Sequence, residues 1–265
     1  MTKQVYIAAG ARTPMGGLQG DLASLTAVQL GSVAIKDAEK RAGLNGEDID
    51  EIIMGCVLPS GLRQGPARQA GIDAGIPVNV GATTVNKLCG SGMKATMLAH
   101  DLIKAGTNNI MVAGGMESMS NAPYLLPKVR NGMRMGHGEI QDVMFTDGLE
   151  DAKTGKLMGA FAQEVADDHQ LTRKDMDDFA ISSLQKAVTA IETGALDAEI
   201  AEVSIKDRRG ERIISCDEQP GKANLDKIPK LRPAFKTDGT VTAANSSSIS
   251  DGASALILVD QETLQ

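Results

Sequence analysis

Tryptophan is absent from this 265-residue chain, and aromatic rings come only from two tyrosines and four phenylalanines. An interior with so few rings must be filled by aliphatic side chains and by the 13 methionines, whose flexible thioethers fit irregular gaps. No window of the sequence is apolar for long enough to span a bilayer, and the N-terminus has no apolar leader. We therefore expect a cytoplasmic protein with no membrane partner.

Basic runs are missing as well, and the formal net charge is −7. This balance argues against nucleic acid as the main partner, although it leaves room for a local basic patch that binds a phosphorylated ligand. The three cysteines, Cys56, Cys89 and Cys216, are odd in number and widely spaced, and no pair has metal-ligand spacing. The pattern predicts free thiols in a reducing compartment and no metal site.

Strand-like and helix-like stretches alternate from residue 5 to residue 115. The predicted strands are 4–9, 52–57, 83–88 and 108–113, and the predicted helices begin near residues 25, 64 and 90. Such alternation is typical of an α/β layered fold with a mainly parallel sheet.

Prolines and glycines make the chain loop-rich after residue 116. Helices are predicted at 160–168 and 172–193, and the second begins with a threonine cap followed three positions later by Asp175. Strands return at 239–244 and 254–259. The α/β pattern is thus interrupted by an insertion, from which we derive the expected division of the chain. Residues 1–120 and 245–265 form one domain, and residues 121–244 form the inserted one.

Cys89 lies between an apolar strand-like run and a helix-like run that ends near Gly106. At the start of a helix, unpaired backbone N–H groups and the positive end of the dipole stabilise a negatively charged sulfur. Gly90 and Gly92 allow the close backbone approach that an acyl group on this sulfur requires. Cys89 is therefore a candidate nucleophile, and a buried core cysteine is the equally weighted alternative. Cys56 lies within an apolar run, which favours a buried core position over a catalytic role.

A nucleophilic cysteine needs a base within reach, and the chain has only three histidines. His100 follows Cys89 by eleven residues, which places it roughly 16 Å further along a helix, too far for proton transfer. His137 lies in a glycine-flanked loop, and His169 ends a predicted helix, where a cation is favourable without any catalytic role. None of the three is a suitable general base for Cys89.

The stretch from Asn86 to Gly92, with Cys89 inside it, resembles the acyl-enzyme signature of the thiolases, the acetyl-CoA acetyltransferases. Six further segments are similar to family blocks and follow in family order: residues 12–14, 66–70, 114–120, 231–235, 239–243 and 245–253. The resemblance implies a thiolase-like layered α-β-α domain with an inserted loop domain. Residues 121–244 would then be the CoA-binding loop domain.

The resemblance also implies roles for individual residues. Cys89 matches the cysteine that is acylated by the thioester, and Ser247 matches the serine that bonds the pantetheine arm of CoA. Phe235 and Met158 match residues that line the acyl and pantetheine channel, and Leu157 stands where short-chain members often have histidine. Ala243 belongs to one of the CoA-binding blocks, and Lys222 and Lys227 are candidate phosphate neighbours, unless they are simply solvated lysines of a charged loop.

By this resemblance the chain is an acyl-CoA C-acetyltransferase that transfers acetyl through a cysteine thioester. It would condense two acetyl-CoA to acetoacetyl-CoA, or thiolyse 3-ketoacyl-CoA. CoA thioesters are then substrates, no cofactor is tightly bound, and a homo-oligomer is expected.

Several parts of the family pattern are missing from the chain. The family's second half, with a Gly-His-Pro histidine, a second cysteine and an Asn-Glu motif, is not matched anywhere in these residues. We therefore expect the chain alone to be incomplete and a separate C-terminal half to be a possible partner. The alternative functions are a non-catalytic CoA- or acyl-CoA-binding half and an assembly subunit of a two-chain thiolase. A cysteine hydrolase lacks a base, and Gly114 and Gly115 lack the third glycine of a nucleotide-binding loop.

Overall fold

The computed structural model describes residues 3–208 and 210–264, and the chain divides into two compact units. The first unit comprises Met1–Ala122, Ala198–Cys216 and Ser250–Gln265, and the second comprises Pro123–Asp197 and Asp217–Ile249. This division differs from the expected one in three places. Residues 121–122 and 198–216 belong to the first unit, and residues 245–249 belong to the second.

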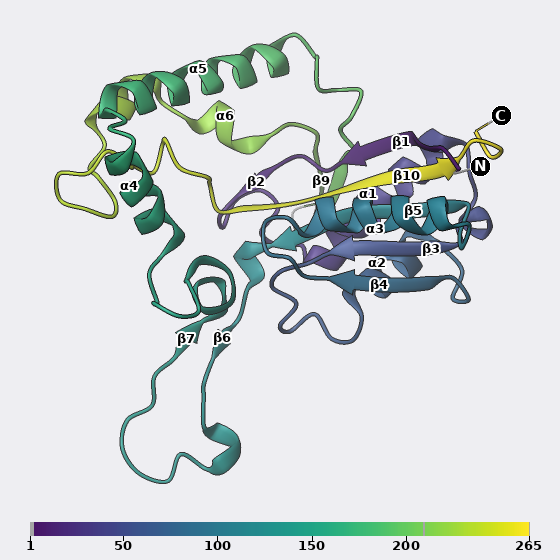
Figure 1. Cartoon of the computed structure of the whole chain (residues 1–265), viewed down its shortest axis with the longest axis horizontal. Coiled ribbons are helices and arrows are strands. Elements are labelled where there is room, and N and C mark those ends of the chain that lie inside the picture. Colours follow the sequence, from purple (N-terminus) through teal and green to yellow (C-terminus); the bar gives the residue numbers. More distant parts are fainter. Residues whose placement is uncertain (1–2, 209, 265) are drawn as a thin grey trace. The chain divides into compact units, whose positions relative to one another are not determined.

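The first unit is built on one sheet of six strands (Figure 1). The order along the sheet is β1 (Val5–Arg12), β10 (Ser250–Asp260), β5 (Ile110–Ser118), β3 (Glu51–Gly55) and β4 (Gly81–Val85), and β2 (Gly16–Gly17) pairs with β10. Strands β4, β3 and β5 are parallel to one another, whereas β10 runs antiparallel to β1, β2 and β5. The sheet is therefore mixed, and the expectation of a mainly parallel sheet is wrong. The last strand of the chain enters the sheet between two earlier strands with the opposite direction.

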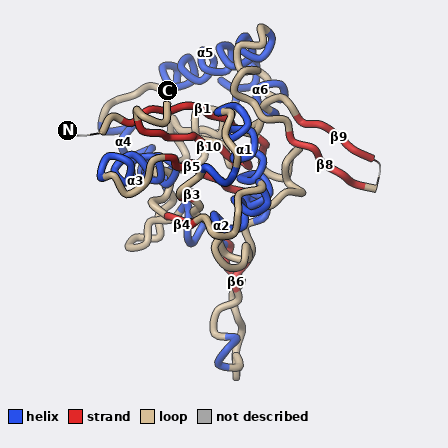
Figure 2. Tube along the Cα trace, turned by 90° about the vertical axis from the view of Figure 1, so that its right-hand side faces the viewer, coloured by secondary structure: helices blue, strands red, loops and turns tan. Residues whose placement is uncertain are grey.

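Helices cover both faces of this sheet (Figures 1 and 2). Helices α1 (Ala27–Ala42) and α2 (Pro66–Ala74) pack on one face, and α3 (Ser91–Ala105) packs on the other. Strand β3 shows how the sequence achieves this, because Ile52 and Met54 are buried in one apolar cluster and Ile53, between them, is buried in the other. The layered α-β-α arrangement expected from the sequence is confirmed.

Strand β5 continues through Gly114 and Gly115 to Ser118, although these glycines were expected to end it near residue 113. The reason is the neighbouring strand. A Cβ added at Gly114 would lie 2.0 Å from the carbonyl oxygen of Ser254 on β10. The glycine therefore permits a close approach of two strands, which is a common role of glycine inside a strand.

The β-hairpin formed by β8 (Val203–Asp207) and β9 (Gly210–Ile214) explains why residues 198–216 belong to the first unit. Val203, Ile205 and Ile214 are buried in the same apolar cluster as the α1 residues. The segment that leads into the hairpin is held by Arg41, whose guanidinium donates to the carbonyl oxygens of Ala198 and Ile200. Burial of three aliphatic side chains against α1 is a contact that no local pattern in the sequence reveals.

The second unit is mainly helical. Its regular elements are β6 (Tyr124–Leu125), β7 (Gln141–Asp142), α4 (Met158–Asp168), α5 (Arg173–Glu192) and α6 (Glu218–Lys222), and one π-helical segment spans Met144–Leu149. Short 3-10 segments lie at Gly46–Asp48, Met119–Asn121, Val129–Asn131 and Leu225–Lys230 across the two units. Helix α5 starts as predicted, because Thr172 accepts from the Asp175 backbone N–H while the Asp175 carboxylate accepts from the Thr172 N–H.

The segment 239–244, expected as a strand, has no strand partner in the described chain. Side chains bond three of its backbone N–H groups instead: Gln163 accepts from Thr240 and Val241, and Asn245 accepts from Thr242. None of the helices within residues 3–208 and 210–264 combines the length and apolarity needed to cross a bilayer.

Asp260 ties the end of β10 to the start of the chain and gives the first unit a pH dependence. Its carboxylate accepts from Lys3 Nζ at 2.7 Å and from the Thr263 hydroxyl at 2.7 Å and backbone N–H at 2.9 Å. These bonds, that from Lys3 first, lower the pKa of Asp260 to about 2. An unfolded aspartate titrates near pH 4, so the stabilisation is complete above about pH 4 and disappears as the pH falls through about 2.

We expect Asp260→Asn to lower the free energy of unfolding at pH 7 by about 1 kcal/mol, a value reduced for the partly exposed Lys3 partner. The difference from the unchanged chain should shrink between pH 4 and pH 2 in urea unfolding followed by circular dichroism. A difference that is constant over this range would show that Asp260 does not supply the pH dependence.

Candidate active site

Cys89 lies on a tight turn between β4 and α3, and its side chain is exposed. The turn is closed by backbone bonds from Gly90 N–H to Lys87 C=O (3.1 Å) and from Ser91 N–H to Leu88 C=O (3.0 Å). The Ser91 hydroxyl adds a bond to Leu88 C=O at 2.6 Å and accepts from Lys87 N–H at 2.8 Å. Helix α3 begins at Ser91, two residues after Cys89. A core cysteine, the alternative weighed from the sequence, is therefore excluded for Cys89.

Glycines let the start of α3 lie directly against the sheet. A Cβ on Gly55, the last residue of β3, would be 2.6 Å from the Cβ of Ser91 and 2.7 Å from the backbone N of Gly92. A Cβ on Gly92 would in turn lie 3.6 Å from the backbone of Gly114. The end of β3 thus fixes where the helix starts, and with it the turn that carries Cys89.

Cys56 lies in the opposite environment, since only 1% of its surface is exposed. Burial, and then the negative charge of Glu117, raise the pKa of the Cys56 thiol to about 12. Its sulfur donates to Glu117 Oε1 at 3.6 Å. The expectation that Cys56 belongs to the core is confirmed by this burial.

This contrast predicts the pattern of thiol labelling in the native protein. Cys89 and Cys216, both exposed, should react with iodoacetamide at pH 8, whereas Cys56 should react on the order of a hundredfold more slowly, because the thiolate is the reactive form. Peptide mass spectrometry of a labelling time course measures all three rates in one sample. Denatured protein, in which all three cysteines should label at similar rates, is the control.

The described structure offers no histidine to Cys89 within the first unit. His100, the one histidine there, lies on α3, where its Nδ1 is 3.0 Å from Asp101. Eleven residues along a helix correspond to roughly 16 Å, which excludes proton transfer between the two side chains. His137 and His169 belong to the second unit, the former in the loop between β6 and β7 and the latter at the end of α4.

A groove of about 1040 Å³ lies within the second unit. One wall is the face of α5 that carries Met176, Phe179 and Leu184, and the facing walls come from residues 219–231 and 243–248. Of the candidate residues, Ser247, Ala243 and Lys222 line this groove, and Lys227 does so too. Ser247 and Ala243 are exposed, so both can reach a ligand. The Lys222 ammonium is bonded to the Glu218 carboxylate one turn earlier.

The loop that carries Ser247 is anchored by Asn245. Its Oδ1 accepts from Thr242 N–H at 2.7 Å, and its Nδ2 donates to Thr240 C=O and to Asp177 Oδ1, both at 3.0 Å. Because Asp177 is a residue of α5, this amide joins the loop to the helix that forms the opposite wall. This side chain thus ties the Ser247 loop to α5.

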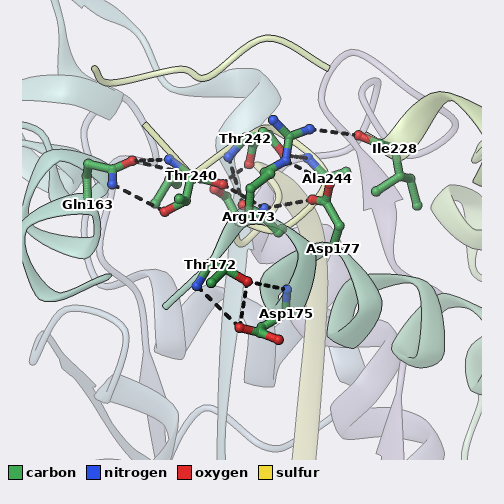
Figure 3. Close-up of polar contacts among 12 residues, drawn as sticks. Gln163, Thr172, Arg173, Asp175, Asp177, Ile228, Thr240, Thr242 and Ala244 are labelled. Carbon is green, nitrogen blue, oxygen red and sulfur yellow. Dashed lines mark hydrogen bonds and ion pairs between the residues drawn. The ribbon is translucent and has the colours of Figure 1, made fainter. Parts of the chain in front are cut away.

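The Asp177 carboxylate, which accepts the hydrogen bond from Asn245, is itself held by Arg173, as Figure 3 shows. Asp177, only 4% exposed, accepts from Arg173 Nε at 2.7 Å, and the same guanidinium donates to Ile228 C=O at 3.0 Å. At the start of the loop, the buried Gln163 accepts from Thr240 N–H at 2.9 Å. A buried carboxylate that accepts from both a cation and an amide is compensated for its desolvation. These bonds hold the loop against α5.

Phe235, Met158 and Leu157 do not line the groove but meet one another at the start of α4. Helix α4 begins at Met158 with Leu157 as its cap residue. The ring of Phe235 covers Gly159, where an added Cβ would be 2.0 Å from the ring atom Cζ. Met158 is 45% and Phe235 37% exposed, so these three residues form a partly open apolar surface next to one helix start.

The family of this chain follows from a match over nearly its whole length. Residues 5–262 match the family model described as thiolase, N-terminal domain. The chain belongs to the thiolase family. The turn with Cys89 and the loop with Ser247 are therefore parts of a thiolase N-terminal domain.

Two curated relatives are longer than this thiolase chain. It is 49% identical over 263 residues to the cytosolic acetyl-CoA acetyltransferase ERG10 of Gibberella zeae, covering 98% of this chain and 66% of the relative. The acetyl-CoA acetyltransferase of Schizosaccharomyces pombe is 47% identical, with 97% of this chain and 65% of the relative covered. The chain thus spans just under two thirds of the length of these relatives.

Two solved structures have the same fold. The acetyl-CoA acetyltransferase of Syntrophomonas wolfei superposes with a TM-score of 0.95 at 41% identity, over 99% of this chain and 66% of that one. The Acat5 thiolase of Ascaris suum, solved in complex with coenzyme A, gives a TM-score of 0.92 at 40% identity, over 99% of this chain and 67% of that one. The expected thiolase-like fold with an insertion is confirmed.

Two parts of the groove in this thiolase chain were not identified from the sequence. The apolar wall, with Met176 and Phe179, lies on α5 at helical spacing, and that spacing could have indicated a shared face. Phe179 is 79% exposed, which is unusual for a phenylalanine. No local pattern in the sequence could indicate the hydrogen bond between Asp177 and Asn245, because the two residues are 68 positions apart. Within the described ranges, no cluster of three metal-ligating side chains is present.

Proposed function

We propose that this chain supplies the acyl-accepting cysteine and the CoA-binding groove of an acetyl-CoA C-acetyltransferase. The observation that carries the proposal is the exposed Cys89 at the start of α3, within a domain whose family match spans residues 5–262. The relatives from Gibberella zeae and Schizosaccharomyces pombe carry this activity in their names.

The first chemical step is a thioester exchange at Cys89. The sulfur, as a thiolate, attacks the carbonyl carbon of acetyl-CoA and forms a new C–S bond, while the bond to the CoA sulfur breaks. The leaving CoA thiolate takes up the proton that the Cys89 thiol lost to the solvent, so charge and atoms balance. In the second step, a base removes a Cα proton from a further acetyl-CoA, and the resulting enolate carbon attacks the carbonyl carbon of the acetyl group on Cys89. A C–C bond forms, the bond to the Cys89 sulfur breaks, and the leaving Cys89 thiolate takes up a proton, which gives acetoacetyl-CoA. The reverse direction is thiolysis of 3-ketoacyl-CoA.

The groove of the second unit supports a CoA thioester as substrate. It pairs an apolar wall on α5 with hydroxyl groups of Ser246, Ser247 and Ser248 and the ammonium groups of Lys222 and Lys227. An elongated ligand with an amide-containing arm and phosphates matches this composition. Ser247 is assigned to the pantetheine arm, Ala243 to its apolar contact, and Lys222 to a phosphate. Leu157, Met158 and Phe235 are assigned to the acyl channel.

Proton transfer in the full reaction requires groups that this sequence does not contain. None of its three histidines lies beside Cys89 in the first unit, and the thiolase Gly-His-Pro motif is not present in these 265 residues. We therefore assign the base and the second cysteine to a further thiolase half. A homo-oligomer and a cytoplasmic location complete the proposal, the latter in line with the relative named as cytosolic.

The test is acetylation of the purified 265-residue chain with acetyl-CoA, followed by peptide mass spectrometry. One acetyl group on the peptide that contains Cys89, removable by hydroxylamine or by free CoA, is the expected result. Absence of acetyl-Cys89 at any pH between 7 and 9, in protein that labels at Cys89 with iodoacetamide, would contradict acyl transfer.

A second candidate function is a non-catalytic CoA- or acyl-CoA-binding half, or an assembly subunit. The observation that favours it is that the described first unit places no histidine beside Cys89. Calorimetry separates this candidate from the first: CoA that binds to the chain without acetyl-Cys89 ever forming supports the binding half. Full-rate thiolysis by the chain alone would contradict both this candidate and the assignment of the base to another thiolase half.

We expect Asn245→Ala to weaken CoA binding about tenfold, because three hydrogen bonds that hold the Ser247 loop to α5 are lost. Isothermal titration calorimetry with CoA measures the change. Asn108→Ala is the matched control, since Asn108 is a buried asparagine of the first unit that donates to Glu51. Equal weakening in both variants would show a general loss of folding and not a loss of loop position.

A further inference from the structure

A path of hydrogen bonds leads from the end of β5 to the Cys89 turn, and it lies entirely within the first unit. Its members are Glu117, Val57, Asn86 and Leu88, and we refer to it as the Glu117 path. Asn86, Leu88 and Glu117 lie in segments that resemble family blocks, but neither the sequence nor the proposed function gave any of these four residues a role of its own. The question is whether the path acts on Cys89 or only supports the fold.

The first link is the partly buried carboxylate of Glu117. Its Oε2 accepts from Val57 N–H at 2.8 Å and its Oε1 accepts from Leu58 N–H at 3.1 Å. Within the described chain, no lysine or arginine pairs with it, so the two backbone N–H groups and the Cys56 thiol are its partners. Burial raises the pKa of Glu117. Bonds from N–H to a carboxylate in such surroundings are strong, so Glu117 fixes the loop that follows β3.

The second link is Asn86, which bridges that loop and the Cys89 turn. Its Nδ2 donates to Val57 C=O at 3.2 Å, on the same residue whose N–H is held by Glu117. Its Oδ1 accepts from Leu88 N–H at 2.9 Å, which is the bond of an Asx-turn. A backbone bond from Cys56 N–H to Val85 C=O at 3.0 Å runs beside it. A shift of Val57 is thereby transmitted to Leu88 through one side chain.

The third link is the conformation of Leu88, the residue directly before Cys89. Its φ is 51°, in the left-handed region, where a branched aliphatic residue is disfavoured by about 1 kcal/mol or more. Leu88 keeps this conformation because its N–H is bonded to Asn86 and its C=O accepts from Ser91. Loss of either bond allows Leu88 to relax to negative φ, and this rotation would carry Cys89 away from the start of α3.

We propose that Glu117 is a positioning residue for Cys89, acting through Val57 and Asn86 to keep Leu88 in the left-handed conformation that places the sulfur at the start of α3. The inference rests on the proposed function in so far as Cys89 is the acyl acceptor. The role is one of geometry: Glu117 belongs to β5 and reaches Cys89 only through these two residues.

The competing explanation is that Glu117 merely stabilises the sheet, and the chain contains a matched control for it. Asp50 Oδ2 also accepts two backbone N–H groups, those of Asn109 at 2.6 Å and Ile110 at 2.9 Å. Asp50 precedes the first residue of β3, whereas the Glu117 partners follow its last residue. Asp50→Asn and Glu117→Gln therefore replace the same kind of charged acceptor by a neutral amide at opposite ends of one strand.

The experiment compares the rates at which iodoacetamide labels Cys89 and Cys216 in the unchanged chain, in Glu117→Gln and in Asp50→Asn. In this reaction a C–S bond forms, iodide leaves, and the thiol proton goes to the buffer. We expect the Cys89 rate to fall at least about threefold in Glu117→Gln, because the sulfur leaves the N-terminal end of α3. The Cys216 rate should stay constant in all three proteins, and the Cys89 rate should be unchanged in Asp50→Asn.

Asn86→Ala tests the middle link with an exposed residue, so it keeps the proposal testable should Glu117→Gln fail to fold. It should slow Cys89 labelling as much as Glu117→Gln does, and the double variant should be no slower than either single one. The proposal is overturned by an unchanged Cys89 rate in Asn86→Ala, by equal rates in Glu117→Gln and Asp50→Asn, or by additive effects in the double variant. Acetylation of the unchanged chain tests the proposed function separately, so the two can fail independently.

Discussion

Cys89→Ala should abolish the transfer of acetyl groups from acetyl-CoA to this chain, with a rate loss on the order of 10⁴-fold or more, the scale seen when a nucleophile is removed. The reason is that no second thiol can substitute for it. Cys56 is buried and its pKa is raised to about 12. Cys216, although exposed, lies after the β8–β9 hairpin and not on the turn that precedes α3.

The measurement is the initial rate of acetyl-peptide formation by mass spectrometry at saturating acetyl-CoA. Cys216→Ala is the matched control, because it removes an equally exposed cysteine and should keep the full rate. CoA binding by calorimetry should be retained in both variants, since the groove lies within the second unit. Acetylation that persists in Cys89→Ala, on any residue and at a comparable rate, would remove Cys89 from the mechanism.

Gly55→Ala should destabilise the first unit and displace the turn that carries Cys89. The added Cβ would be 2.6 Å from Ser91 Cβ and 2.7 Å from the backbone of Gly92, so the start of α3 has to move away from β3. Overpacking of this kind costs about 3 kcal/mol. The displaced helix start carries Cys89 with it, and we therefore expect acetylation to fall together with stability.

Gly81→Ala is the control for this change. Gly81 opens β4, the strand paired with β3, and a Cβ there would meet only Glu51 Cγ at 3.7 Å, an ordinary contact. Since alanine loses less backbone entropy on folding, this variant should be as stable as the original chain or slightly more so. Urea unfolding followed by circular dichroism compares the two. Equal midpoints for Gly55→Ala and Gly81→Ala would show that α3 does not depend on the space at Gly55.

Local signals in the sequence located several elements correctly, each for a reason that operates within a few residues. The capping box of Thr172 and Asp175 is satisfied by atoms three residues apart, so it could be identified without knowledge of the fold. The same holds for α3, whose end at Gly106 requires only a residue that tolerates positive φ. The alternating burial of Ile52, Ile53 and Met54 on the two faces of the sheet likewise follows from strand geometry.

The errors all concern pairings between distant segments. The direction of β10 made the sheet mixed, and its approach to Gly114 let β5 continue past a glycine pair. The segment 239–244 lacks a strand partner because the side chains of Gln163 and Asn245 bond its backbone. The hairpin of residues 203–214 joined the first unit because its aliphatic side chains complete the cluster on α1. Periodicity within a segment carries no information about any of these partners.

The sequence by itself determined the alternation of strands and helices, the start of a helix just after Cys89, and the family blocks that bring this cysteine together with the Ser247 loop in one chain. Only the tertiary structure decided that Cys89 is exposed while Cys56 is buried beside Glu117, that Asn245 fixes the groove wall, and that Glu117 reaches the Cys89 turn through Asn86. The physical reason is the separation along the sequence over which each kind of interaction acts. Caps, turns and periodicity depend on neighbours within one or two turns of chain, whereas burial and hydrogen-bond partnership depend on residues as far apart as Thr13 and Ala253, 240 positions from each other.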